Sequence, residues 1–227
     1  MNHFRQERIL PIDAIVFPVT VIGAGGIGSP TTLMLAKIGF ENITLIDSDA
    51  IEDHNVPNHL LWGPTDAGRP KVDTAHERVL CLTGIAIKKH ACSFPNESLP
   101  TLSGIVISGV DSMESRKAIW SKVAWNSKIP VYLDARTGVG TKGQWMEIHT
   151  VRPSCLEDVE FYEKHLHEAQ DIDPDLACDA FLPVNMAIAS LIGSQLTHWL
   201  MQEPYWQRLV FNLKNLTLIR QEERQKS

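Results

Sequence analysis

Residues 19–40, VTVIGAGGIGSPTTLMLAKIGF, give the clearest indication of the architecture. The first four of these residues suit a strand that is buried on both faces of a sheet. A glycine-rich turn follows, and after it apolar residues recur at helical spacing. Gly23, Gly25 and Gly28 satisfy G-x-G-x-x-G between the strand and the helix. In this context the pattern predicts a loop that holds nucleotide phosphates at a helix N-terminus.

The rest of the first half repeats the alternation of strand and helix. We expect strands at 19–22, 43–46, 105–108 and 131–133, and helices at 27–38, 72–82 and 112–125. Parallel strands joined by helices are typical of doubly wound sheets. The sequence therefore predicts an α/β protein with a Rossmann-like, mostly parallel sheet.

The second half predicts an extension of this sheet within the same domain. A strand is expected at 144–151, an apolar helix at 183–201, and an antiparallel hairpin or edge strand within 208–220. The acidic segment 152–179 between them is interpreted as a long crossover loop with a short helix at 156–165. Such long loops are usually functional. We expect one domain over 1–220, followed by a disordered tail at 221–227.

The composition excludes several classes of partner. The chain has 227 residues, 44% of them hydrophobic, and a formal net charge of −6. An acidic chain without a Lys/Arg cluster is not expected to bind nucleic acid. No apolar run reaches the roughly 18 residues that a membrane span needs, and the N-terminus lacks signal-peptide character. The four cysteines form no C-x-x-C pair, which argues against zinc and favours a reduced, cytoplasmic protein.

Charged side chains follow the strands where a ligand of the glycine loop would lie. Asp47 ends the second strand, where a carboxylate can accept hydrogen bonds from ribose hydroxyls. Asp49 follows two residues later, and Lys71 starts the next helix. Asp111 comes after the third strand, at the lip of the same crevice. Carboxylates and a lysine around a phosphate loop favour ATP with Mg²⁺ over a dinucleotide.

These groups stand in an ordered set of motifs. GAGGIGS is followed by D-x-D at 47–49, HN-x-x-N at 54–58, GRPK at 68–71 and D-S-x-x-x-R at 111–116. The set resembles that of the ThiF/MoeB/HesA superfamily of ubiquitin-activating-enzyme-like adenylyltransferases, over residues from about 5 to 200. The resemblance implies ATP-dependent adenylation of the C-terminal glycine of a ubiquitin-like, β-grasp protein. It also implies Mg²⁺ as the cofactor.

The resemblance assigns roles to single residues. It implies that Gly26 backs the nucleotide phosphates and that Asp47 holds the ribose. Asn55 and Lys71 would reach the phosphates, and Asp111 would position the metal ion. The nucleotide-binding set is then Gly23, Gly25, Gly26, Gly28, Asp47, Asp49, Asn55, Asn58 and Lys71.

The N-terminal segment FRQERILP resembles a further element of the family, RQ-x-x-x-P. The resemblance implies that Arg5 reaches the nucleotide of the partner subunit in a homodimer. The zinc-binding C-x-x-C pairs of the family are missing. The chain therefore resembles a short, zinc-free branch, such as those of bacterial ubiquitin-like conjugation operons.

The chain departs from the family pattern at one position of the phosphate site. The Arg-Gln that usually follows the asparagine by three residues is Asn58-His59 here. We expect Arg136, in LDARTG, to replace the missing catalytic cation, with Arg69 as the second candidate. A structural pairing of Arg136 with Asp134 is the alternative.

The cysteines leave the second half-reaction open. Cys178 lies just before the apolar helix, where the resemblance places a cysteine, and a helix N-terminus lowers the pKa of a thiol. It is the first candidate for a thioester with the carrier and for transfer to a conjugating, E2-like enzyme. Cys155 is the second candidate, and direct release of the adenylate is the alternative. Cys81 and Cys92 are expected in the core.

Two other functions stay open at this stage. An NAD(P)-dependent oxidoreductase would use the same glycine loop, but the sequence shows no convincing Tyr-Lys or His set for hydride transfer. A non-catalytic, nucleotide-binding scaffold is the other, because the family arginine is missing at Asn58.

Overall fold

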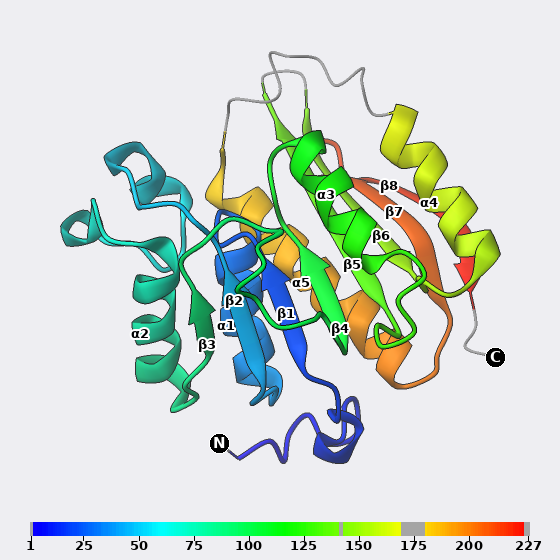
Figure 1. Cartoon of the computed structure of the whole chain (residues 1–227), viewed down its shortest axis with the longest axis horizontal. Helices are drawn as coiled ribbons and strands as arrows, with labels where there is room; N and C mark the ends of the chain where they lie inside the picture. The colour runs from blue at the N-terminus through cyan, green and yellow to red at the C-terminus, as the bar shows by residue number, and fades with distance from the viewer. Residues whose placement is uncertain (1, 141–142, 169–179, 225–227) are drawn as a thin grey trace.

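The buried apolar runs form the strands of one sheet. They are β1 (Val19–Ile22), β2 (Ile43–Ile46), β3 (Lys88–His90), β4 (Ile105–Ser108), β5 (Tyr132–Val139), β6 (Gln144–Val151), β7 (Tyr205–Asn212) and β8 (Thr217–Arg224). The computed structural model describes residues 2–140, 143–168 and 180–224, and in this part of the chain the strand order is β3-β2-β1-β4-β5-β6-β7-β8 (Figure 1). The first five in that order are parallel, and β6, β7 and β8 are antiparallel. The predicted Rossmann-like sheet with its antiparallel extension is confirmed.

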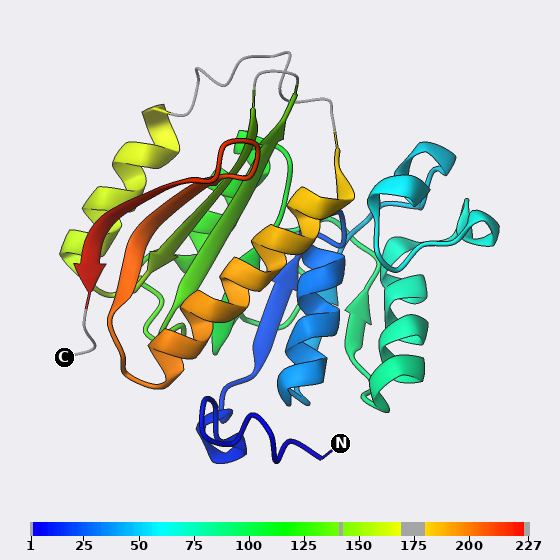
Figure 2. The same ribbon diagram turned by 180° about the vertical axis from the view of Figure 1, so that it is seen from behind.

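Helices cover both faces of this sheet. They are α1 (Gly28–Ile38), α2 (Lys71–Thr83), α3 (Met113–Val123), α4 (Leu156–Glu168) and α5 (Leu182–Leu200). α3 and α4 lie on one face (Figure 1), and α1 and α5 lie side by side on the other (Figure 2). The core is accordingly divided into two buried apolar clusters, one on each side of the sheet.

Local sequence signals account for the helix boundaries. α1 ends at Gly39, whose φ of 118° lies in the left-handed region that glycine adopts without strain. α3 begins after Ser112, whose hydroxyl accepts a hydrogen bond from the backbone N–H of Ser115. Three short 3₁₀ helices, η1 (Ile12–Ala14), η2 (Asp53–Asn58) and η3 (Pro64–Asp66), lie in the connections.

Two predictions about the second half are wrong in part. The loop expected at 152–179 contains α4, which is longer than the expected helix at 156–165. Val159, Tyr162 and Leu166 recur at helical spacing and are buried against the sheet, so this acidic helix has an apolar face. Residues 169–179 lie outside the described residues. In the tail expected at 221–227, residues 221–224 belong to β8, where Gln221 pairs with Arg208 on β7.

Candidate active site

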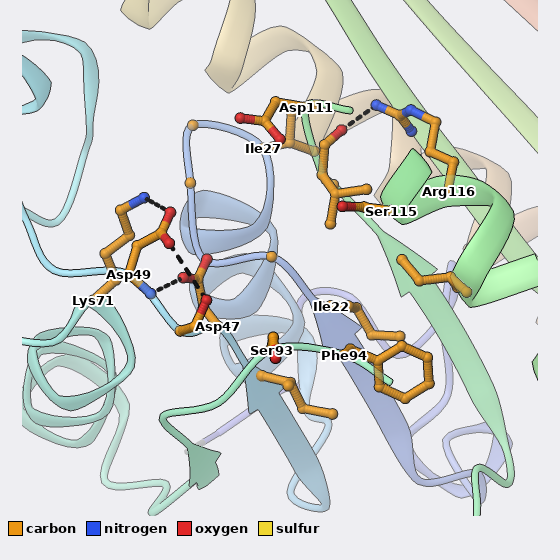
Figure 3. Close-up of a pocket in the computed structure, with 18 of the residues that line it drawn as sticks. Ile22, Ile27, Asp47, Asp49, Lys71, Ser93, Phe94, Asp111, Ser115 and Arg116 are labelled. Atoms are coloured by element: carbon orange, nitrogen blue, oxygen red, sulfur yellow. Dashed lines mark hydrogen bonds and ion pairs between the residues drawn. The ribbon is translucent and has the colours of Figure 1, made fainter. Parts of the chain in front are cut away.

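A cavity of about 410 Å³ opens at the carboxyl ends of β1, β2 and β4 (Figure 3). The strand order turns here, because β2 and β4 lie on either side of β1 and are reached by connections in opposite directions. Ligands of open α/β sheets bind at such a point. The cavity is lined by Gly23, Gly25 and Gly26 of the glycine loop and by Asp47, Asp49, Lys71 and Asp111, so the structure brings these predicted residues together. Gly28 does not line it and instead packs closely on the backbone of Gly23.

The glycine loop forms the floor of the cavity. At Gly23, φ is +97° and an added Cβ would lie 2.6 Å from the carbonyl oxygen of Gly109, so only glycine fits. A Cβ at Gly25, by contrast, would meet nothing within 4 Å. The protein itself leaves this space open, and a phosphate could fill it at the N-terminus of α1, which no side chain caps.

Asp47 is held rigidly beside the loop. Its Oδ2 accepts a hydrogen bond of 2.6 Å from the backbone N–H of Ala24, and its Oδ1 accepts one of 2.7 Å from that of Asp49. Burial raises the pKa of Asp47 above its ordinary value, although these two hydrogen bonds and the charge of Lys71 oppose the shift. A carboxylate accepts more than two hydrogen bonds, so Asp47 keeps capacity for ribose hydroxyls.

Two further charged groups flank the glycine loop. Lys71 Nζ lies 2.8 Å from Asp49 Oδ2, and the lysine side chain is only 12% exposed. Asp111 is exposed on the other side of the loop (Figure 3). Mg²⁺ uses one or two protein carboxylates and takes its other ligands from water and phosphate. Asp111 therefore fits an ion bound together with a triphosphate. The described residues contain no group of three or more side chains that would form a metal site alone.

Arg116 lines the cavity from α3, although the sequence prediction did not name it as a site residue. It donates hydrogen bonds to Asp134 Oδ1 and to the carbonyl oxygens of Val110 and Ala135. Asp134 is fully buried and also accepts from Arg136. Burial alone would raise the pKa of Asp134, but the guanidinium groups of Arg116 and Arg136 lower it to about 2. Arg116 is the last residue of the motif D-S-x-x-x-R, so this motif could have indicated it as a site residue.

The structure supports the structural alternative for Arg136. Its side chain is 6% exposed, its Nε lies 2.8 Å from Asp134 Oδ2, and it is not among the residues that line the cavity. Arg69 is also engaged elsewhere, with Asp66 at 3.3 Å and Glu77 at 2.6 Å. Neither arginine lines the cavity.

Other predicted residues lie outside the cavity. Asn55 and Asn58 do not line it, and Asn55 Oδ1 accepts a hydrogen bond from the backbone N–H of Glu52 within η2. Arg5 is exposed in the N-terminal segment, away from the cavity of its own chain. Cys155 is half-buried beside Arg152, whose Nη2 lies 3.4 Å from its Sγ. Cys178 lies outside the described residues.

The cavity wall contains residues that sequence reasoning missed. His59 and Asn185 line it near the glycine loop, and Cys92 lines it together with Phe94. The prediction that Cys81 belongs to the core is wrong, because Cys81 is exposed. Cys92 is half-buried and packs against the core cluster on the α3 side of the sheet, as well as lining the cavity. No sequence pattern around Asn185 indicates that it lines the cavity, because its position depends on how α5 packs.

The fold and the position of this cavity are those of α/β domains of the Rossmann-like class. More specifically, the chain belongs to the ThiF family, whose model matches residues 16–226. No helix within the described residues is long and apolar enough to cross a membrane.

Named relatives agree with this assignment. The chain is 36% identical over 104 residues to the NEDD8-activating enzyme E1 catalytic subunit of Arabidopsis thaliana. This match covers 44% of this chain and 23% of that protein. It is 26% identical over 200 residues to ubiquitin-like modifier-activating enzyme 5 of Caenorhabditis elegans, covering 76% of this chain and 44% of the relative. The chain thus spans less than half the length of these relatives.

Solved structures show the same fold. The structure of Escherichia coli MccB with AMPCPP and MccA superimposes with a TM-score of 0.69 at 19% identity, over 95% of this chain and 66% of that chain. MccB with ATP gives the same TM-score over 93% and 65% of the two chains.

Proposed function

We propose that the protein is an ATP-dependent adenylyltransferase that activates the C-terminal glycine carboxylate of a ubiquitin-like, β-grasp protein. The observation that carries the proposal is the arrangement around the glycine loop, where Asp47 lies beside the loop and Lys71 and Asp111 flank it. This arrangement suits a triphosphate with a divalent cation. The names of the relatives, which are activating enzymes for NEDD8 and a ubiquitin-like modifier, support the class of carrier.

In this reaction the carrier carboxylate attacks the α-phosphate and pyrophosphate leaves. The glycine loop and the N-terminus of α1 hold the phosphates, and Asp47 holds the ribose. Lys71 adds positive charge beside the phosphates. Mg²⁺ at Asp111, when bound, would neutralise charge on the departing pyrophosphate. Positioning and electrostatic stabilisation supply most of the rate enhancement.

Calorimetry with two nucleotides tests this proposal. ATP with Mg²⁺ should bind to the full chain, and NAD⁺ should bind weakly or not at all. Tight binding of NAD⁺ without binding of ATP would overturn it in favour of an oxidoreductase. Binding of ATP without pyrophosphate exchange, in the presence of a co-purifying small protein that ends in glycine, would favour a scaffold.

We further propose that Cys178 carries the activated carrier as a thioester before transfer to an E2-like partner. With ATP and carrier, a thiol-sensitive adduct should form, and Cys178→Ala should abolish it while pyrophosphate exchange continues, because the thiol acts only after adenylation. Cys81→Ala is the matched control, since Cys81 is exposed on α2. Normal conjugation by Cys178→Ala would contradict this proposal. The remaining alternatives would then be a thioester at Cys155 or direct transfer of the adenylate.

A homodimer is part of the same proposal, since Arg5 would then serve the nucleotide of the partner subunit. Large apolar side chains near Arg5 support an interface, with Phe4 82% exposed, Ile9 68% and Val16 70%. Light scattering at micromolar concentration should give the mass of a dimer. A fully active monomer would exclude both the dimer and the role of Arg5 in the partner.

The free thiols of Cys81, Cys92 and Cys155 support a cytoplasmic location.

A further inference from the structure

His59 lines the cavity, and one of its ring nitrogens has no hydrogen-bond partner among the described residues. Its Nδ1 lies 2.7 Å from the carbonyl oxygen of Asn55, and because a carbonyl can only accept, Nδ1 carries the hydrogen. The ring stacks on Trp62, with the ring centroids 5.7 Å apart. Within the described part of the chain no group bonds to Nε2, which is therefore the nitrogen available to a ligand.

The backbone next to His59 is tied to the phosphate loop. Asn185 on α5 donates a hydrogen bond of 2.9 Å from its Nδ2 to the carbonyl oxygen of Asn58. The same amide packs on Gly26, where an added Cβ would lie 2.4 Å from Nδ2. This bridge holds the backbone that precedes His59 beside the glycine loop.

The other cations of the cavity wall are already engaged. Lys71 pairs with Asp49 at 2.8 Å, and Arg116 is bonded to Asp134 and to two carbonyl oxygens. A triphosphate brings several negative charges into a cavity that also holds Asp47 and Asp111. Among the described residues that line the cavity, His59 is the group that can add a positive charge when the nucleotide arrives.

We infer that His59 binds the nucleotide phosphates through Nε2 as an imidazolium, taking up a proton from solvent when the nucleotide binds. This inference rests on the proposed function of the cavity as an ATP site. The imidazolium donates hydrogen bonds from both nitrogens, so the contact to Asn55 is kept while Nε2 gains a phosphate oxygen.

The groups that face His59 agree with this change of charge. Burial holds the pKa of His59 below its ordinary value of 6.5, and Lys71 from α2 and His54 from η2 lower it further. Asp47 after β2 and the hydrogen bond to Asn55 act in the opposite direction. α5 and the glycine loop contribute neutral groups, Asn185 and glycines. The ring is thus neutral near pH 7 without nucleotide, and a polyanion beside Nε2 raises its pKa.

The test measures proton uptake by calorimetry of the full chain with AMPCPP and Mg²⁺, in buffers of different ionisation enthalpy. The wild type should take up more protons per nucleotide than His59→Asn, whose amide can keep the contact to Asn55. The affinity of the wild type for AMPCPP should fall with rising pH, by up to about tenfold per pH unit above neutrality. His59→Asn should show only the pH dependence of the nucleotide itself, and His59→Arg should bind without proton uptake.

The control is His54→Gln, since His54 is exposed in η2, the 3₁₀ helix that His59 directly follows, and the proton uptake of this variant should be close to that of the wild type. Nucleotide binding with equal proton uptake in wild type and His59→Asn would overturn the inference but keep the proposed function. Failure of the wild type to bind AMPCPP at any pH would instead overturn the proposed function, and the inference with it. Circular dichroism of each variant separates these results from misfolding.

Discussion

Replacing Asp111 by asparagine should lower carrier-dependent pyrophosphate exchange by about 100- to 1000-fold and leave the fold unchanged. The carboxylate is the proposed metal-ion ligand, and loss of a metal ion's charge stabilisation costs several kcal/mol in the transition state. Asn keeps the shape of the side chain and removes its charge. Because Asp111 is exposed at the rim of the cavity, no packing is lost.

The matched control for this variant is Glu114→Gln. Glu114 is an exposed carboxylate in the first turn of α3 and does not line the cavity, so its neutralisation should leave exchange unchanged. Exchange is measured with a candidate carrier that ends in glycine, and the thermal unfolding of both variants is compared with that of the wild type. Full exchange by Asp111→Asn would move the metal-ion site elsewhere.

Removing the carboxylate of Asp134 should destabilise the protein by about 3–5 kcal/mol, the cost of leaving a buried charge without its partner. Asp134 is fully buried and accepts hydrogen bonds from Ser108 Oγ at 2.7 Å and from Tyr162 OH at 3.0 Å. It also neutralises Arg116 and Arg136, which are themselves buried. Asp134→Ala leaves both guanidinium groups without a counterion.

Urea unfolding of Asp134→Ala measures this cost. The control is Asp49→Ala, which breaks an ion pair whose carboxylate is 62% exposed and should cost less than about 1 kcal/mol. Equal stability of Asp134→Ala and the wild type would show that the buried cluster does not depend on its central charge.

The pH dependence of stability follows from the same carboxylate. The pKa of Asp134 is about 2 in the folded protein, below its ordinary value of 3.8. A group with a depressed folded pKa stabilises the protein fully above its unfolded pKa, and this contribution is lost as the pH falls through the folded value. About 2 kcal/mol should therefore disappear between pH 4 and pH 2, and Asp134→Asn should lack this part of the acid transition.

The fold class and the floor of the site could be predicted from local sequence patterns. The strand and helix signals around the glycine loop are local, and buried strands read as continuous apolar runs, so β1, β2 and β4 could be predicted directly. Asp47, Lys71 and Asp111 could be placed at one edge because parallel strands bring their carboxyl ends together.

The other groups that reach the cavity are brought there by packing between distant segments. Arg136 and Asp134 lie two residues apart on one face of β5 and pair with each other, whereas Arg116 arrives at the cavity wall from α3. Asn185 meets the backbone of Asn58 across 127 positions of the chain. These contacts depend on how helices pack on the sheet, and a local pattern carries no information about packing between segments so distant in sequence. The fold and the charged groups that follow the parallel strands could therefore be predicted, whereas Arg116 and Asn185 reach the cavity through long-range packing.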